Sequence, residues 1–340
     1  TLNTHMQDVV HSALKRAVRQ HDAKRGVAVL MEVETGAIKA LANYPEDYNY
    51  AVATQIEPGS AVKLASVLAL LQDGHAQPGD TVDTGNGVVR YYDRTMRDHL
   101  SYGKLTFKQC FEKSSNVGIS QLVTQAYKQD PRDFFLHLEN FGLLSHTGFQ
   151  LKGEPAPYVI QPNDNMWSGA SLPWLSIGYN IKLTPLQILT FYNAVANGGS
   201  LMRPYLVERI RDNSGVVQEY GPKVQRPQIA SPAAIAQAQE FLVGVVENGT
   251  GRGIRHAQYD IAGKTGTVQK LEEGQYVKRY RSSFVGYFPA KDPKYSCIVL
   301  LDEPRNDDFY GAEVAAPVFK EIADNIFSTL LEEHYPPAAV

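Results

Sequence analysis

The sequence has few cysteines, only Cys110 and Cys297 among its 340 residues. Two cysteines are too few for a disulfide framework, and both lie in apolar stretches, so we expect two buried thiols. No run reaches the roughly 18 apolar residues that a bilayer-spanning helix needs, and no signal peptide is visible. The first residue is Thr1 and not Met, which indicates a fragment or a processed form.

A strong charge of either sign is also missing. The 33 Lys and Arg residues nearly balance 36 Asp and Glu residues, which gives a net charge of -3. No cluster of basic residues alternates with aromatic ones, so we expect no nucleic acid as a partner. The nine histidines show no H-E-x-x-H or comparable spacing. We therefore expect no metal site and no cofactor.

The length and the order of predicted elements indicate two packed lobes. A chain of 340 residues exceeds the size at which one hydrophobic core stops growing. Apolar periodicity and breaker residues predict helices at 3–20, 61–71, 105–113, 117–126, 186–197, 233–247 and 312–332. Strands are predicted at 26–31, 37–42, 259–262, 264–268, 283–288 and 295–301. This order favours an α/β (α+β) fold with a sheet from both chain ends and an all-helical lobe inserted between its halves.

The motif S-x-x-K occurs three times, at 12–15, 60–63 and 101–104. Only Ser60 stands at the start of a long apolar helix. There the amine of Lys63 can reach its hydroxyl because positions i and i+3 share a helix face, and burial lowers a lysine pKa toward neutrality. The alternative is a capping serine beside a lysine that reaches out to solvent, and the motif alone does not decide between them.

A second motif, S-x-N, occurs at 114–116, between two predicted helices. Serine and asparagine are common in such turns for capping reasons alone, so a purely structural role is the alternative.

The third motif is K-T-G at Lys264–Gly266, followed by Thr267, on a predicted strand. Two threonine hydroxyls and an ammonium on one strand edge can hold a carboxylate. A phosphate-binding loop with the same Lys-Thr end is excluded because it needs glycine at position 258, which is Gln258.

The three motifs occur in the order that penicillin-binding proteins and class A β-lactamases share. The sequence resembles the transpeptidase domain of class B penicillin-binding proteins from about Asn3 to Phe327. Further similar segments are 33–36, 57–60, 115–118, 176–179, 184–187, 197–199, 262–267, 283–287 and 315–319. The resemblance implies the fold shared with serine β-lactamases, an antiparallel sheet flanked by helices. It places the sheet lobe at about 1–60 and 250–340, and the helical lobe at about 61–249.

The resemblance implies a peptidoglycan D,D-transpeptidase that acts on stem peptides ending in D-Ala-D-Ala, with possible D,D-carboxypeptidase activity. Ser60 is the implied nucleophile and Lys63 its base. By the family pattern Ser114 relays a proton to the leaving amine, Asn116 orients Lys63, and Lys264 keeps the site positive. The implied carboxylate seat is Thr265, Gly266 and Thr267, and the implied oxyanion hole is the backbone N–H groups of Ser60 and Thr267.

The implied ligands and partners follow from the same resemblance. They are β-lactams as covalent inhibitors and, for a cell-division enzyme, divisome proteins including a glycan polymerase. The implied place is the periplasmic side of a bacterial membrane, with the membrane reached only through an N-terminal anchor. We expect that anchor and the pedestal domain of the family to be absent from this sequence. The segment 45–55 is shorter than the one that the family usually has at this place.

Three alternatives stay open from the sequence. One is an elongation-type transpeptidase of the same class. Another is a serine β-lactamase, in which Glu154 would activate the deacylating water, although Ser115 stands where class A β-lactamases carry aspartate. The third is a β-lactam sensor that keeps Ser60 and Lys63 without synthetic activity.

Overall fold

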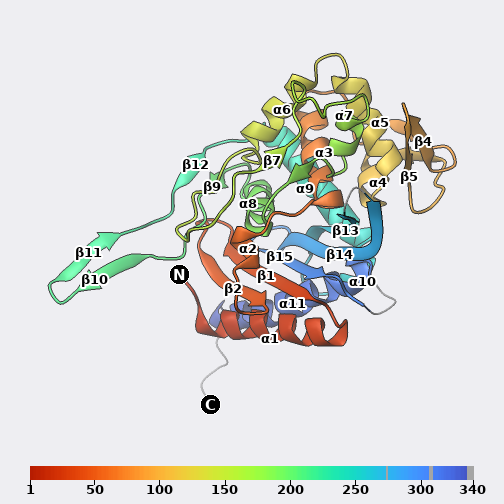
Figure 1. Cartoon of the computed structure of the whole chain (residues 1–340). Coiled ribbons are helices and arrows are strands. Elements are labelled where there is room, and N and C mark those ends of the chain that lie inside the picture. The colour runs from red at the N-terminus through yellow and green to blue at the C-terminus, as the bar shows by residue number, and fades with distance from the viewer. Residues whose placement is uncertain (273–274, 306–308, 335–340) are drawn as a thin grey trace.

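A five-stranded antiparallel sheet forms the centre of the molecule (Figure 1). The computed structural model describes residues 1–272, 275–305 and 309–334. The strands, in the order β13-β14-β15-β1-β2, are β13 (Ala262–Glu272), β14 (Gln275–Phe288), β15 (Tyr295–Asp302), β1 (Arg25–Glu32) and β2 (Ile38–Tyr44). β15 pairs with β1 in a continuous register from Arg25↔Asp302 to Glu32↔Tyr295. Segments from both ends of the chain therefore meet in the middle of the sheet, which confirms the predicted fold class.

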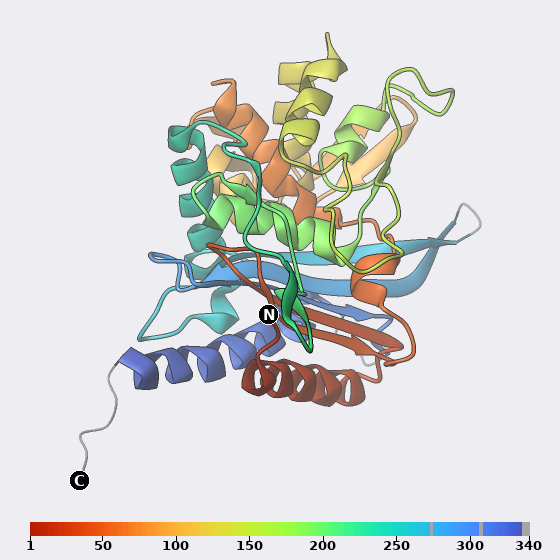
Figure 2. The same ribbon diagram turned by 90° about the vertical axis from the view of Figure 1, so that its left-hand side faces the viewer.

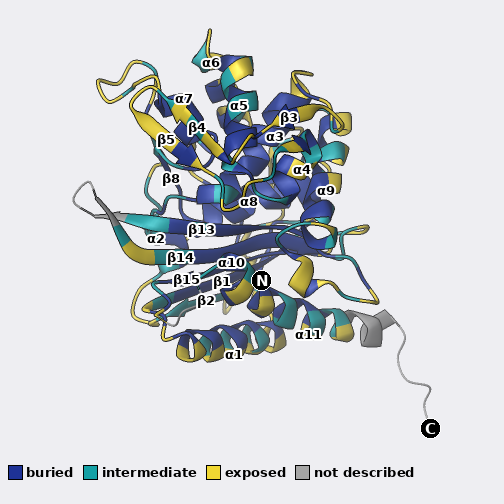
Figure 3. Ribbon diagram, turned by 90° about the vertical axis from the view of Figure 1, so that its right-hand side faces the viewer, coloured by how far each residue is buried: buried dark blue, intermediate teal, exposed yellow. Residues whose placement is uncertain are grey.

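Two helices, α1 (Thr4–Gln20) and α11 (Ala316–His334), cover one face of the sheet (Figure 2). Side chains alternate across a strand, so Ala28 and Leu30 of β1 point to these helices and join a core with Phe319 and other buried residues. The N-cap residue of α1 is Asn3, whose side chain accepts a hydrogen bond from the amide of Met6. The outward sides of both helices are largely exposed, as expected for surface helices with one apolar face (Figure 3).

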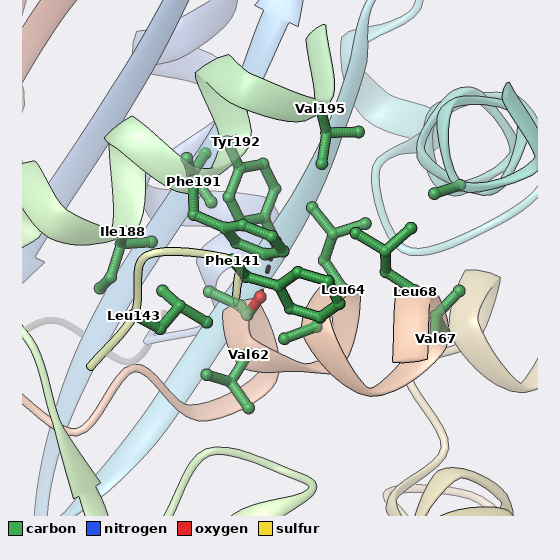
Figure 4. Packing of buried hydrophobic residues seen from close by; sticks show 14 of the residues in the cluster. Val62, Leu64, Val67, Leu68, Phe141, Leu143, Ile188, Phe191, Tyr192 and Val195 are labelled. Atoms are coloured by element: carbon green, nitrogen blue, oxygen red, sulfur yellow. Dashed lines mark hydrogen bonds between the residues drawn. The ribbon is translucent and has the colours of Figure 1, made fainter. Parts of the chain in front are cut away.

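A mainly helical lobe covers the opposite face. Its helices are α2 (Tyr50–Ala53), the 3-10 helix η1 (Gly59–Val62), α3 (Lys63–Gln72), α4 (Phe107–Glu112), α5 (Asn116–Tyr127), α6 (Pro131–Asn140), α7 (Ser171–Leu175), α8 (Pro185–Ala196) and α9 (Pro232–Glu247). Every residue of α8, and every residue of α3 except Gln72, is buried. Leu64 and Leu68 of α3 pack in one cluster with Phe141, Phe191 and Tyr192 (Figure 4). This packing fixes the helix that follows Ser60.

The lobe also carries five two-stranded ribbons, so the expectation of an all-helical lobe is wrong in this detail. The ribbons are β3 (Thr81–Asp83) with β6 (Lys104–Thr106), β4 (Val88–Tyr91) with β5 (Arg94–Arg97), β7 (Tyr158–Val159) with β8 (Ile181–Lys182), β9 (Leu201–Met202) with β12 (Val224–Arg226), and β10 (Arg209–Asp212) with β11 (Gly215–Glu219). The β10–β11 ribbon projects away from the body (Figure 1). All residues of β10 and β11 are exposed. Neither strand has a buried face, so the apolar alternation that predicts a half-buried strand is missing from this segment.

The predicted helix at 312–332 is divided in the structure. α10 (Gly311–Val314) is followed by its C-cap residue Ala315, and α11 begins at Ala316. A methyl group at Gly311 would lie 2.4 Å from the carbonyl oxygen of Gly266, so α10 is held directly against β13. The lobe boundaries near residues 60 and 250 stay a prediction.

Cys110 and Cys297 are free thiols, and each is buried in one of the two cores, as predicted. Within the described residues, no helix combines the length and apolar character that crossing a membrane requires.

Candidate active site

Ser60 lies on the short helix η1, held between β13 and the loop that contains Gly178. Gly59 has a left-handed backbone, with φ of +52°, and a methyl group there would lie 2.3 Å from the side chain of Val268. Its amide donates to the carbonyl of Gly178 over 3.2 Å, and a methyl group on Gly178 would lie 2.1 Å from the carbonyl oxygen of Gly59. Two glycines therefore allow the backbone before Ser60 to approach both neighbours closely.

Lys63 is the first residue of α3, and its side chain is fully buried. Its Nζ donates to the carbonyl of Ser114 over 2.7 Å, to Oδ1 of Asn116 over 2.7 Å and to Oγ of Ser114 over 3.3 Å. Burial lowers the pKa of Lys63 from 10.5 to about 7, against the smaller opposing effects of Asp98 and Cys110. An amine with such a pKa is partly uncharged near neutral pH and can accept a proton.

Ser114 stands between α4 and α5 with a left-handed backbone, with φ of +59°. This conformation is uncommon for a residue with a side chain. Its Oγ accepts a hydrogen bond from Nζ of Lys264 over 2.9 Å and donates to Oγ of Ser60 over 3.1 Å. The Ser114 hydroxyl therefore contacts the side chains of Lys63, Ser60 and Lys264. Among the described contacts, Ser60 is linked to Lys63 through Ser114 and not by a direct hydrogen bond.

Lys264 reaches the same point from the sheet. It lies on β13, is fully buried, and also donates to the carbonyl of Thr265 over 3.1 Å. Burial, and next the charge of Lys63, lower the pKa of Lys264 well below its ordinary value. Because both amines contact one hydroxyl, a full positive charge on each of them is disfavoured. A proton can therefore pass between Lys63 and Lys264 through Ser114 with a small change in free energy.

The remaining predicted residues, Thr265 to Thr267, continue along β13 beside this site. The Oγ1 atoms of Thr265 and Thr250 lie 2.7 Å apart. The hydroxyl of Thr267 accepts the amide N–H of Gly311 over 2.9 Å, which leaves its own hydrogen available to a ligand. A methyl group on Gly266 would lie 2.3 Å from Oγ of Ser283, so only glycine fits there without displacing that side chain.

The other two S-x-x-K segments do not join this cluster. Ser12 is exposed on α1, and Ser101 is exposed with its hydroxyl donating to the carbonyl of Asn86 over 2.7 Å. Only the segment at 60–63 meets 114–116 and 264–267.

The sequence patterns did not predict one neighbour of the site, Asp98. The carboxylate of Asp98 accepts hydrogen bonds from the hydroxyl of Ser115 over 2.6 Å, the amide of Asn116 over 2.5 Å and the amide of Val117 over 2.9 Å. Asp98 follows the β4–β5 ribbon and belongs to no recognisable motif, so no pattern in the sequence marks it.

Comparison with known proteins identifies the family of this chain. Residues 26–324 match the family model described as the penicillin binding protein transpeptidase domain. A probable peptidoglycan D,D-transpeptidase PenA of Neisseria flavescens is 33% identical over 97% of this chain and 82% of its own length. The peptidoglycan D,D-transpeptidase FtsI of Escherichia coli K12 is 28% identical over 97% of this chain, which spans 56% of that relative.

Solved structures show the same likeness. The TP domain of penicillin-binding protein 3 from Burkholderia pseudomallei superposes with a TM-score of 0.85 and 28% identity, covering 100% of this chain and 97% of that one. Penicillin binding protein 3 from Mycobacterium tuberculosis, solved in complex with ampicillin, superposes with a TM-score of 0.87 and 29% identity, covering 99% of this chain and 78% of that one. The chain therefore belongs to the transpeptidase domain family of class B penicillin-binding proteins.

Proposed function

We propose that this chain is a peptidoglycan D,D-transpeptidase whose acyl-enzyme forms on Ser60. One observation carries the proposal: the hydroxyls of Ser60 and Ser114 are in hydrogen-bond contact, and two buried lysines with lowered pKa donate to Ser114. A hydroxyl in contact with a base through a polar partner is the arrangement that activates a serine nucleophile. The relatives named peptidoglycan D,D-transpeptidases support the same activity.

In the first step Ser60 attacks the carbonyl carbon of the penultimate D-Ala of a donor stem peptide. Hydroxyl hydrogens rotate, so the Ser60 proton can pass to Ser114 while the Ser114 proton passes to uncharged Lys63. Lys63 is then an ammonium, and Asn116 holds it through Oδ1. The proton returns through Ser114 to the nitrogen of the terminal D-Ala, the C–N bond breaks, and D-Ala leaves.

In the second step the amine of a neighbouring stem peptide attacks the ester carbonyl. Lys63 accepts the proton lost by the amine, an amide forms, and the Ser60 oxygen regains a proton as it leaves. Water in place of the amine gives a free carboxylate, which is D,D-carboxypeptidase activity. The two acyl transfers share one nucleophile and one base.

The donor peptide is proposed to lie along β13. This strand ends the sheet order β13-β14-β15-β1-β2 and so presents an edge to which an extended peptide can add. The hydroxyls of Thr265 and Thr267, with Gly266 between them and the amine of Lys264 nearby, are proposed to hold the terminal carboxylate. The backbone N–H groups of Ser60 and Thr267 are proposed to stabilise the oxyanion.

We place this activity on the periplasmic side of a bacterial membrane, in septal cell-wall synthesis. Relatives named FtsI favour the cell-division role over the elongation role. Divisome proteins, including a glycan polymerase, are the proposed partners. β-Lactams are the proposed covalent inhibitors, supported by related structures in complex with ampicillin and aztreonam.

The β-lactamase alternative loses support from the position of Glu154. Its carboxylate accepts the amide and the hydroxyl of Thr147 over 2.8 and 2.9 Å, and the side-chain amide of Gln187 over 2.9 Å. These contacts anchor the 147–154 loop to α8. Among the described contacts, none joins Glu154 to Ser60, Lys63 or Ser114.

Intact-protein mass spectrometry after incubation with benzylpenicillin tests the proposal. We expect one long-lived covalent adduct, which Ser60→Ala abolishes. Ser101→Ala is the matched control, because it alters an exposed S-x-x-K serine, and it should form the adduct at the wild-type rate. Rapid release of hydrolysed penicillin would indicate a β-lactamase, and no adduct on the folded wild-type protein would refute acylation at Ser60.

A further inference from the structure

The carboxylate of Asp98 lies at the N-terminal end of α5, beside the turn that carries Ser114 and Asn116. Asp98 directly follows β5, and its amide donates to the carbonyl of Gly87 over 2.8 Å. The β4–β5 ribbon is fastened to the lobe by Met96, which is buried with Trp174 and Ile177, and by the hydroxyl of Tyr91, which lies 3.0 Å from that of Ser120. The position of Asp98 is therefore set by a packed ribbon and not by a free loop.

Three donors of α5 converge on this carboxylate: the Ser115 hydroxyl and the amides of Asn116 and Val117. The first amides of a helix have no partner within the helix, and the helix dipole favours negative charge there. The Ser115 side chain caps the amide of Gly118 over 2.9 Å, so serine and aspartate together satisfy the first turn. A structural cap alone would explain these contacts.

Two observations extend the role of Asp98 to the reaction. The side-chain amide of Asn116 donates to the carbonyl of Arg97 over 2.9 Å, which turns its Oδ1 toward Lys63. The residue before Asp98 thus orients the amide that holds Lys63. Asp98 itself contacts residues 115–117, which directly follow the strained backbone of Ser114.

The second observation is electrostatic. The titratable groups that act on Lys63 are Asp98 on the ribbon side and Cys110 on α4, and Lys264 on β13 shares the Ser114 hydroxyl. The charge of Asp98 also acts on Tyr102. Burial, and next Asp98, raise the pKa of Tyr102. The charge of Asp98 raises the pKa of Lys63 and so opposes part of the effect of burial.

We propose that Asp98 is a positioning residue for the acyl transfer: it fixes the 114–116 turn against Lys63 and supplies the negative charge that balances the buried lysine pair. This inference rests on the proposed acylation of Ser60. It makes the β4–β5 ribbon a part of the catalytic scaffold, although the ribbon itself contributes no group that contacts the substrate.

The test compares Asp98→Asn with wild type in the acylation rate by benzylpenicillin across pH, together with the Tm. We expect the rate at high pH to fall by about 10- to 100-fold, because a misplaced Ser114 and Asn116 no longer align with Lys63. We also expect the midpoint of the pH profile to move to lower pH, because the negative charge that raised the Lys63 pKa is gone. Asp98→Glu keeps the charge, so its midpoint should return to the wild-type position while its rate stays reduced.

Asp130→Asn is the matched control, since Asp130 caps α6 in the same lobe by accepting the amide of Arg132. It should leave both rate and midpoint unchanged. A loss of Tm in Asp98→Asn with a wild-type rate and midpoint would show a cap only and would overturn the proposal. If Asp98→Asn does not fold, a wild-type rate in Asp98→Glu, despite its displaced carboxylate, overturns it instead. Absence of an adduct on wild type would refute acylation at Ser60 itself. That result differs from the two outcomes given for the Asp98 variants, in which wild type still forms the adduct.

Discussion

The hydroxyl of Ser114 donates to the hydroxyl of Ser60 over 3.1 Å, although the two serines lie 54 residues apart in the chain. The contact joins the start of η1 to the turn between α4 and α5. With Lys264 donating to the same Ser114 oxygen, it also joins both to the edge strand β13. The proposed chemistry therefore depends on three segments that local sequence alone does not bring together.

The protonation of Lys63 leads to a prediction for the pH dependence of acylation. We expect the rate of benzylpenicillin acylation to rise with pH through an apparent pKa near 7, because burial lowers the pKa of Lys63 to about 7 and only the uncharged amine accepts a proton. Stopped-flow or quenched mass spectrometry across pH measures this. A rate that stays flat until about pH 10, near the ordinary lysine pKa, would contradict the assignment of Lys63 as the base.

The same shift makes a prediction for stability. Between pH about 7 and 10.5 the unfolded chain keeps the proton of Lys63 and the folded protein has released it. Because the unfolded state then binds more protons, the contribution of Lys63 to the free energy of unfolding rises with pH over this window. Replacing Lys63 by Met removes this contribution. Urea unfolding at several pH values should show a shallower rise in that variant, and an unchanged slope would count against the buried, uncharged amine.

The close approach before Ser60 predicts an effect of Gly178→Ala on acylation. The methyl group would lie 2.1 Å from the carbonyl oxygen of Gly59, so the backbone that carries Ser60 must move. We expect the acylation rate to fall by about 10-fold or more. Gly74→Ala is the control because both glycines have a positive φ, +92° at Gly178 and +69° at Gly74, but Gly74 has open space around it. Both variants should lose about 1–3 kcal/mol of stability from backbone strain, and only Gly178→Ala should lose activity.

Packing around α3 predicts a large effect of Leu68→Ala on stability. Leu68 is fully buried between α3 and its neighbours, so the substitution leaves a cavity and should lower the free energy of unfolding by about 2–5 kcal/mol. Leu136, on α6, is 56% exposed, and Leu136→Ala should change the free energy of unfolding by less than about 0.5 kcal/mol. Equal losses in the two variants, measured by urea unfolding, would contradict the described core.

The two thiols are predicted to be unreactive in the folded protein. Burial raises the pKa of Cys110 to about 12 and that of Cys297 further still, so almost no thiolate is present at neutral pH. A thiol reagent such as DTNB should label neither cysteine in native buffer and both in denaturant. Rapid labelling of one thiol in the native protein would show that its part of the core opens.

The sequence predicted best those features that combine a local signal with burial. The helix at 186–197 was predicted within one residue of α8, since Thr184 and Pro185 form a strong start signal and the structure shows the full capping box with Gln187. The meeting of the three motifs was likewise predicted, because each stands at the boundary of a buried element.

Features set by distant contacts were not predicted. The strand predicted at 259–262 is wrong except for Ala262, where β13 begins, and β13 runs on to Glu272, beyond the strand predicted at 264–268. Gly263 lies near the start of β13, where a methyl group would meet the ring of Phe284 at 2.5 Å. Asp98 was missed because its partners lie 17 to 19 residues further along and no local pattern marks them. A single sequence shows which residues can cap or pack, but not which remote donor an isolated carboxylate meets.

The central place of β15 has a consequence for biosynthesis. The β13–β14 pair reaches the N-terminal strands β1 and β2 only through β15, whose last residue is Asp302. A nascent chain on the ribosome therefore cannot complete the sheet until nearly nine-tenths of these residues have been made, however early Ser60 and Lys63 emerge. Reactivity toward penicillin should therefore appear only after β15 has been made.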